Sequence, residues 1–318
     1  MQAIVASAWA VFILLGIGAI GFFVVAKKIV PGEVLRHISK LAIEVALPLF
    51  IFTNLVEKFD PVASPDWWGL PLWWIGFAAV TLAMSLVFGL LFKKDTRREA
   101  VASLYLYNPT FFPLAIIIGI FGSDSPYIAD LFLFTMLATM YYFSIYKFFF
   151  RDKREIAKPF KLTLDIRKIF NPLVIVTVLA LAIVLAGVDK FIPAAVLSIT
   201  SHIGGMAFPL IMVLLGGYVY LDLKRSGRFY FGQVIKFVAI KNLVFPLIMI
   251  GIVYLIRPDY SAALILVLSA AAPPLSSVPI LVERENGNTE ITNQFLVASF
   301  LFSIVSVPAT VMLLDMVL

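Results

Sequence analysis

The sequence predicts an all-α membrane protein with ten transmembrane helices. Hydrophobic residues make up 62% of the 318 residues and charged residues only 14%, whereas a soluble domain carries about 25% charged residues. Apolar runs of about 20 residues, the length at which a helix crosses a bilayer, recur along the whole chain. Two of these runs contain several prolines, and we expect them to be broken helices.

Each predicted helix has the length and apolar character of a membrane span. The first has no basic residue before it and is too long for the core of a signal peptide, so we expect it to be retained as a span. Polar residues enter the second and the seventh. The ten ranges are 3–28, 36–56, 68–92, 99–121, 127–149, 171–188, 194–221, 231–256, 260–282 and 292–315.

Basic residues fall almost entirely in alternate loops. The loops that follow odd-numbered spans hold 20 lysines and arginines, whereas the other loops hold three, Lys58, Lys190 and Arg257. Because cytoplasmic loops of membrane proteins are rich in lysine and arginine, both termini are predicted to lie outside. The same bias explains the net charge of +6 without a nucleic-acid partner.

A basic cytoplasmic connection at 151–170 separates two groups of five spans, residues 1–150 and 171–318. Similar motifs occur in both groups, ALPLF at 46–50 and AFPLI at 207–211. Such pairs could recur by chance in an apolar sequence. If they mark repeats, the odd number of spans makes the second repeat enter the membrane from the opposite side, which gives an inverted repeat.

Spans 4 and 9 are expected to break inside the membrane. Proline has no backbone N–H and its ring clashes with the preceding turn, and the freed carbonyls need partners where water is absent. Interrupted spans at corresponding positions of two repeats indicate the binding site of a secondary transporter. The predicted crossover formers are Pro109 and Pro113 in span 4, and Pro273, Pro274 and Pro279 in span 9.

Polar residues beside these prolines are candidate substrate ligands. Half-helix N-termini offer unpaired amides and the positive end of the helix dipole to an anion. Asn108, Thr110, Ser276 and Ser277 could add side-chain donors, and Phe112 could form an apolar wall. Alternatively, the two serines satisfy carbonyls freed by the prolines, and Phe112 packs in the core.

Two ionisable residues fall inside predicted spans. Lys241 lies about ten residues into span 8, which is too deep for easy snorkelling at 1.5 Å per residue. It could attract an organic anion, exchange a proton with a carboxylate partner, or only hold span 8 in place. Glu44 in span 2 could couple transport to a proton or ion, pair with a basic group, or lie near the headgroups at a dimer interface.

The tryptophans at the outer end of span 3 are interpreted as interfacial anchors, not as a ligand cage. They occur as two pairs, Trp67-Trp68 and Trp73-Trp74. Tryptophan is enriched at membrane–water interfaces because its ring is amphipathic.

Several kinds of chemistry are excluded by what the sequence lacks. Cysteine is absent, which removes disulfides, thiol chemistry and cysteine-ligated metals. There is no HExxH motif, no pair of mid-membrane aspartates, and no nucleophile with a nearby base, so no catalytic or metal site is predicted. No nucleotide-binding loop is present. The protein is therefore not expected to be an enzyme or to need a cofactor.

Two stretches carry a resemblance to a known family. LSITSHIGGMAFPLIMVLLGG, within 170–219, is similar to the seventh span of the auxin efflux carrier family, and APPLSSVPILVERENG at 272–287 is similar to its ninth. The resemblance covers nearly the whole chain and is nearest to bacterial malonate-carrier-like members. It implies ten spans in inverted repeats, with spans 1, 2, 6 and 7 as a dimer-forming scaffold. Spans 3–5 and 8–10 would form a mobile transport domain.

Span 4 departs from the family pattern. Family members often have Asn-Thr-Gly before a later Gly-Leu-Pro, whereas residues 108–113 here are Asn-Pro-Thr-Phe-Phe-Pro. Asn108 is the counterpart of the family's substrate-binding asparagine, or that counterpart is shifted by about two positions.

The expected function is a secondary transporter, an efflux carrier or permease in the cytoplasmic membrane. Its substrate would be a small organic anion such as a carboxylate, moved by elevator-type alternating access, with Na⁺ or H⁺ as candidate coupling ions. The alternative is a sodium-coupled organic-anion symporter, because bile-acid-type sodium symporters share the architecture that the resemblance implies. A homodimer is expected only from the resemblance.

Overall fold

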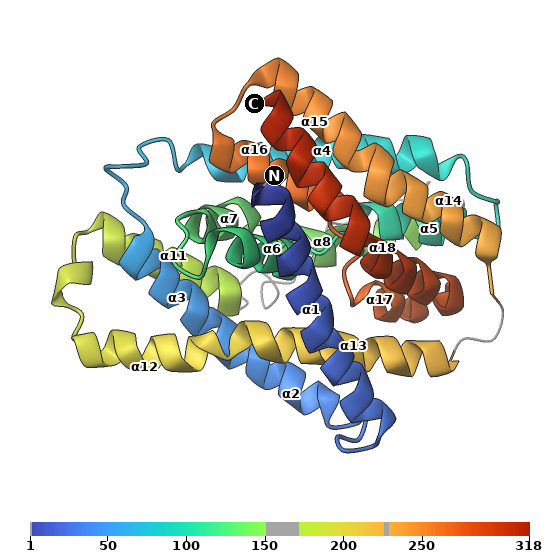
Figure 1. The fold of residues 1–318 in the computed structure, drawn as a ribbon, viewed down its shortest axis with the longest axis horizontal. Coiled ribbons are helices and arrows are strands. Elements are labelled where there is room, and N and C mark those ends of the chain that lie inside the picture. Colours follow the sequence, from blue (N-terminus) through green and yellow to red (C-terminus); the bar gives the residue numbers. More distant parts are fainter. Residues whose placement is uncertain (1, 151–171, 226–228) are drawn as a thin grey trace.

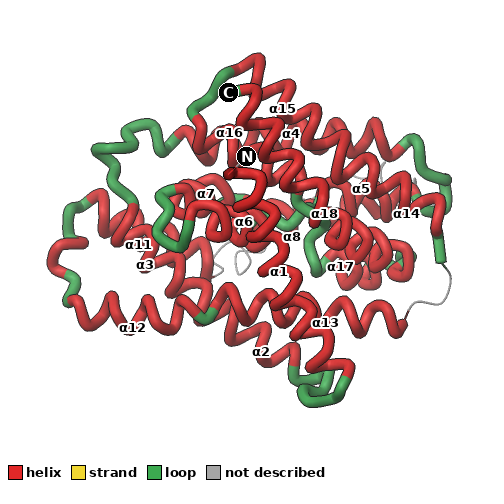
Figure 2. The backbone as a smooth tube through the Cα atoms, in the orientation of Figure 1, coloured by secondary structure: helices red, strands yellow, loops and turns green. Residues whose placement is uncertain are grey.

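The computed structural model describes residues 2–150, 172–225 and 229–318. Every regular element in this part of the chain is helical, and Figure 2 shows helices joined by loops. The predicted all-α fold is therefore confirmed. The basic connection predicted at 151–170 lies outside the described residues.

Helices occupy all ten predicted ranges. The first group of elements comprises α1 (Gln2–Ala26), α2 (Leu35–Leu41), π-helix η1 (Ala42–Ala46), α3 (Leu47–Lys58), α4 (Gly69–Gly89), α5 (Arg97–Tyr105), α6 (Phe111–Phe121), α7 (Tyr127–Thr135), α8 (Ala138–Ile145) and 3₁₀-helix η2 (Tyr146–Phe150). The second comprises α11 (Pro172–Leu185), 3₁₀-helix η3 (Asp189–Phe191), α12 (Ala194–Gly205), α13 (Ala207–Arg225), α14 (Phe231–Ala239), π-helix η4 (Ile240–Val244), α15 (Phe245–Ile256), α16 (Tyr260–Ala271), α17 (Val278–Arg284) and α18 (Thr289–Val317).

Length and composition qualify several of these helices as membrane spans by themselves. Among the described residues, four are long and apolar enough: Leu35–Lys58, Gly69–Gly89, Ala194–Leu221 and Phe231–Ile256. A fifth follows if the two arms of α18, Thr289–Ser303 and Val305–Val317, which meet at 54°, form one span. The structure therefore supports a multi-pass membrane protein. The count of ten spans, their inverted topology and the outside location of both termini stay predictions.

Prolines explain the irregular turns inside the long helices. The π-turn of η1 ends two residues before Pro48, and that of η4 ends two residues before Pro246. A proline cannot donate to the carbonyl four residues earlier and pushes it away, and a π-bulge is one way in which a helix accommodates this. The bend of α18 likewise lies one turn before Pro308.

By their contacts the helices form two packing groups, each of which draws helices from both halves of the sequence (Figure 1). In the first group, α1 packs on α13, and α3 packs on α11 and α12. In the second, α4 packs on α5 and α7, while α18 packs on α14 and α16. The groups meet where α1 contacts α6 and α18, and where α3 contacts α7. The predicted division into scaffold spans 1, 2, 6 and 7 and transport spans 3–5 and 8–10 stays a prediction.

Glycines bring α1 and α13 into backbone contact. A Cβ placed on Gly21 would lie 2.0 Å from the Val213 carbonyl oxygen, and one on Gly216 would lie 1.7 Å from the Gly18 oxygen. Helices inside membranes associate through such small residues because hydrocarbon solvent supplies no hydrophobic drive between them. The α1–α13 contact therefore depends on residues without side chains.

The interpretation of the tryptophans as anchors is wrong for Trp74. This side chain is only 3% exposed, and its ring lies edge-on to Tyr141 and Tyr142 at centroid distances of 5.4 and 6.3 Å. Trp68, in contrast, is 58% exposed, as expected of an interfacial residue. The two differ because Trp74 is on the side of α4 that faces the other helices, which the spacing of tryptophans alone does not reveal.

Candidate functional site

Two broken helices meet inside the protein. The linker 106–110 separates α5 from α6, and the linker 272–277 separates α16 from α17; together these linkers are called the crossover below. They pair antiparallel through a bridge between Tyr107 and Pro274. The Asn108 amide donates to the Pro273 carbonyl at 2.9 Å, and the Leu275 amide donates to the Leu106 carbonyl at 2.8 Å. Each linker thus satisfies backbone groups that the break in the other leaves free.

The prolines enforce the breaks in two ways. Pro109, Pro273 and Pro274 lie in the linkers, where they lack the N–H that a continuous helix needs. Ala272, which precedes Pro273, has the extended backbone (φ −64°, ψ 137°) that proline favours in the residue before it. Pro113 and Pro279 lie instead in the first turns of α6 and α17, where a missing N–H costs no helical hydrogen bond.

Asn108 caps the second half of the first broken helix. Its Oδ1 accepts from the backbone amides of Phe111 at 3.1 Å and Phe112 at 3.4 Å. Pro113 has no N–H, and the Leu114 amide donates to the Thr110 carbonyl at 2.9 Å. The expectation of unpaired amides at this half-helix is therefore wrong, because the preceding asparagine already occupies them.

The capping fixes the direction of the Asn108 carboxamide. Only the carbonyl end can accept from the two amides, so the Nδ2 end, which carries two donors, points away from them. None of the described residues accepts a hydrogen bond from this Nδ2. Asn108 is 5% exposed. The crossover thus holds an oriented side-chain donor on a largely buried residue.

A small cavity lies beside Thr110, between the two helix groups. Its volume is about 20 Å³, and Thr135 of α7 and Thr177 of α11 also line it. Both of these hydroxyls donate to carbonyls of their own helices, at 2.8 and 2.7 Å. A cavity of this size holds about one water molecule. In this conformation the seam beside the crossover is closed to an organic anion.

The other predicted ligands of the crossover have different surroundings. Ser276 is half-buried in the linker. Ser277 directly precedes α17, and its buried Oγ has no hydrogen-bond partner among the described residues. Phe112 packs edge-on against Phe300 of α18, with ring centroids 6.2 Å apart. This contact agrees with the alternative prediction that Phe112 packs in the core.

Lys241 is buried next to the crossover. It is 1% exposed, and its Nζ donates to the Ala270 carbonyl of α16 at 3.1 Å. The ammonium also lies over the rings of Tyr107 and Phe245, at 5.5 and 5.0 Å from their centroids, within the range of cation–π attraction. No described carboxylate lies within 4.0 Å of it.

Glu44 is separate from this arrangement. Its side chain is exposed in the π-turn η1, and none of the described residues forms a hydrogen bond or an ion pair with it. It does not line the cavity beside Thr110. A role in ion coupling therefore stays a prediction with no contact in this conformation to support it.

Sequence reasoning missed a group of buried polar atoms behind the crossover. The Tyr107 hydroxyl lies near the Tyr142 hydroxyl, the Trp74 indole nitrogen and the Ser269 hydroxyl. These four atoms are buried and have no hydrogen bond of good geometry among the described residues. They come from the first linker and from α8, α4 and α16. Aromatic residues in apolar helices resemble core packing, so only the mid-span position of their polar atoms could have indicated them.

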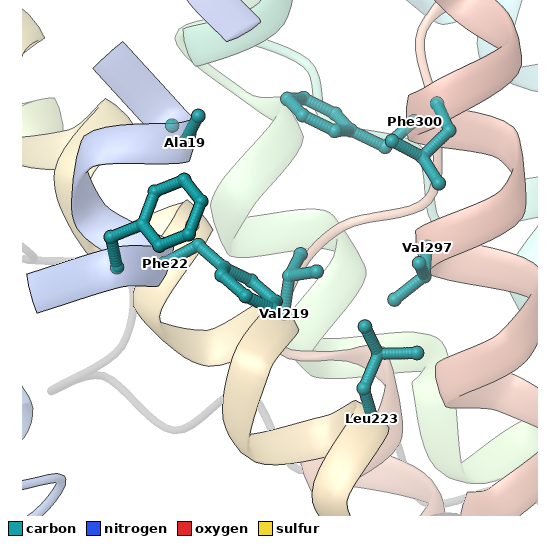
Figure 3. A pocket seen from close by; sticks show the side chains of 10 residues that line it. Ala19, Phe22, Val219, Leu223, Val297 and Phe300 are labelled. Carbon is teal, nitrogen blue, oxygen red and sulfur yellow. The ribbon is translucent and has the colours of Figure 1, made fainter. Parts of the chain in front are cut away.

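An apolar groove opens where α1, α13 and α18 meet (Figure 3). Its volume is about 410 Å³, and side chains of Phe22, Val219 and Phe300 are among those that surround it. Every residue that lines it is apolar or glycine. Ligand pockets combine an apolar lining with a few placed polar groups, which this groove lacks, so it does not fit an anionic substrate.

Among the described residues, no group of three or more His, Asp or Glu side chains could hold a metal ion.

Comparison with known proteins identifies the family. A family model described as membrane transport protein matches residues 7–311. No curated protein sequence matches the chain. Because the matched range covers nearly all of the sequence, the chain belongs to the membrane transport protein family, the family of the auxin efflux carriers, and is a membrane transporter.

Proposed function

We propose that this protein is a secondary transporter that moves a small organic anion, such as a carboxylate, across the cytoplasmic membrane. The observation that carries this proposal is the orientation of Asn108 in the crossover. Its carbonyl end is held by the amides of α6, so its donor end is left for a ligand. A donor held in this direction at the crossover can bind an anion, which supplies an acceptor for it.

Other groups around the crossover favour negative charge in the ligand. The N-terminus of α6 carries the positive end of its helix dipole. The hydroxyl of Ser277 is unpaired among the described residues, and that of Thr110 borders the cavity. The Lys241 ammonium lies behind Tyr107 and adds a positive potential at short range. A carboxylate has the acceptors to use these donors together.

The closed cavity supports a mechanism of alternating access. Thr110 comes from the second helix group, whereas Thr177 comes from the first, so the cavity lies at the seam between the groups. It has room for about one water, so a substrate enters only if the groups move relative to each other. We assign this motion to an elevator in which spans 3–5 and 8–10 move against spans 1, 2, 6 and 7.

We also propose a membrane topology and a second copy of the chain as a partner. Ten spans in two inverted repeats, with both termini outside, place the crossover near the middle of the bilayer. A second copy of the chain is proposed to cover the exposed face of the scaffold group, where Glu44 and apolar neighbours such as Ile43 and Val45 are exposed.

The decisive variant is Asn108→Asp. Aspartate caps a helix as well as asparagine does, so α6 keeps its acceptor, but the free donor end becomes a second negative oxygen. We expect Asn108→Asp to fold and to lose both stabilisation by carboxylates and uptake of labelled carboxylate into vesicles. Thermal unfolding of the purified protein against a panel of mono- and dicarboxylates measures the first effect, because a ligand of the folded state raises the unfolding temperature.

Asn54→Asp is the matched control. Asn54 is also buried and its Oδ1 already accepts from Lys58 at 3.0 Å, but it lies in α3 away from the linkers. We expect this variant to retain carboxylate binding. Equal binding in the wild type and in Asn108→Asp would refute the proposed site, and the absence of stabilisation by any carboxylate would refute the anionic substrate.

A further inference from the structure

The C-terminal end of α16 points into the protein interior. The helix ends at Ala271, because Ala272 is extended before Pro273. The last turn of any helix leaves carbonyls without intrahelical donors, and these carry the negative end of the helix dipole, about half a charge. Residues 262–272 are all buried, so bulk water does not compensate this end. A cation is the expected partner.

Lys241 supplies that cation from the neighbouring span. Its ammonium donates to the Ala270 carbonyl at 3.1 Å, within the last turn of α16. The rings of Tyr107 and Phe245 hold the charge from two other sides, and Tyr107 is itself paired with Pro274 in the second linker. A single positive charge is thus bound to a half-helix C-terminus at the crossover.

Adjacent contacts fix this direction of Lys241. The residue lies in the π-turn η4 that precedes Pro246. The next side chain, Asn242, donates to the Ser299 carbonyl at 3.0 Å and accepts from the Ser299 hydroxyl at 2.7 Å. These two hydrogen bonds tie the π-turn to α18 and set its rotation. Asn242 is therefore a positioning residue for Lys241.

The place that the ammonium occupies is one that metal cations use in other transporters. Where broken helices bind Na⁺, the ion is coordinated by unwound carbonyls and by half-helix C-terminal ends. We infer that Lys241 is a built-in cation that stands in for a coupling Na⁺ at the end of α16, so that this transporter works without sodium. The inference rests on the proposed function, since it concerns the coupling of that same site.

The test compares the stability of the purified protein in sodium chloride and in choline chloride at equal ionic strength. For the wild type we expect unfolding temperatures that agree within about 1 °C, because the cation site is already filled. For Lys241→Ala we expect a lower value in choline chloride. Sodium or ethylammonium chloride should then raise it saturably by about 3 °C or more, since either cation can enter the emptied site.

Lys236→Ala is the matched control. Lys236 lies five residues earlier in the same span, and its ammonium donates to the Leu91 carbonyl, just beyond the end of α4, at 2.6 Å. This contact is exposed, so water replaces it. We expect no saturable effect of either cation on this variant.

Two results would overturn the inference. One is a saturable effect of sodium on the wild type, which decides the matter even if Lys241→Ala does not fold. The other is a folded Lys241→Ala protein that neither cation stabilises. Both are separate from the proposed function, because carboxylate binding is measured independently: sodium dependence with carboxylate binding intact refutes only the built-in cation. Loss of the anionic substrate with the cation pattern intact refutes only the proposed function.

Discussion

Asn108 serves as a helix cap and as a candidate ligand with opposite ends of one side chain. The carbonyl end replaces the intrahelical acceptors that the break before α6 removes. Because that end is occupied, the chemistry left for a substrate is donation only. A residue that looked from the sequence like a general polar group is thus restricted to anions and other acceptors by its local hydrogen bonds.

The cap predicts a difference between two substitutions at this position. Asn108→Ala removes the acceptor for both amides of α6, and we expect it to lower the free energy of unfolding by about 1 kcal/mol. Asn108→Asp keeps the acceptor and should unfold close to the wild type in the absence of substrate. Chemical denaturation in mild detergent compares the two. Equal destabilisation by alanine and aspartate would contradict the capping role.

Buried polar side-chain atoms also gather around the Tyr107 hydroxyl. Tyrosine and serine side chains contribute polar atoms that an apolar sequence pattern does not register. In the structure the atoms of Tyr107, Tyr142, Trp74 and Ser269 are enclosed together without good mutual hydrogen bonds. Because unpaired buried donors are costly, apolar packing alone does not account for this arrangement beside Lys241 and the crossover.

At the scale of elements, the irregular turns lie where prolines allow them, and they carry residues of the candidate site. The π-turn η4 holds Lys241 and Asn242, and the two linkers hold Asn108 and Ser277. Breaks in regular hydrogen bonding release carbonyls and amides inside a membrane, and those groups then require partners. The positions of prolines in the sequence therefore locate the polar centre of the protein, although they do not identify the partners.

The close contact between α1 and α13 can be tested by adding a methyl group to α1. Gly21→Ala places a Cβ 2.0 Å from the Val213 oxygen, so α1 has to shift from α13. We expect a loss of roughly 1–3 kcal/mol of stability, as for overpacking of a core. The control is Gly16→Ala in the same helix, where a Cβ meets nothing within 4 Å. Alanine is there the better helix former, so stability should be unchanged or higher.

Thermal unfolding of the two glycine variants in one detergent checks this pair. Since both substitutions add the same methyl group to the same helix, the difference between them isolates the close approach to α13. If Gly16→Ala proves as harmful as Gly21→Ala, the packing of α1 on α13 is not as the structure has it.

At the scale of the molecule, the two helix groups meet along a seam that holds the small cavity beside Thr110. Lys58 of α3 connects the groups at one end of this seam. Its ammonium lies 3.2 Å from an Asp124 carboxylate oxygen and donates to the Ser123 carbonyl at 2.6 Å. Asp124 is almost fully exposed, so this pair contributes little to stability. A contact so weak does little to hold the two groups together.

The charge bias predicts which loops face the cytoplasm, and the absence of cysteine makes the test simple. We expect a cysteine at Ser64 to react with a membrane-impermeant maleimide on intact cells. A cysteine at Lys94 should react only after the membrane is opened, since basic loops are cytoplasmic. Both positions are exposed in the structure, so neither result is limited by burial. The reverse pattern of labelling would invert the predicted topology.

The sequence by itself determined the helical class, the ranges of the helices, the two breaks and the family to which the chain belongs. These follow from local properties: apolar length is set by the bilayer, and proline interrupts a helix wherever it stands in the interior. Tertiary structure alone decided which way Asn108 points, that Lys241 reaches the end of α16, and that Trp74 turns inward to two tyrosines. Each of these depends on which helix faces meet across long stretches of chain, and helical periodicity does not specify the partner of a face.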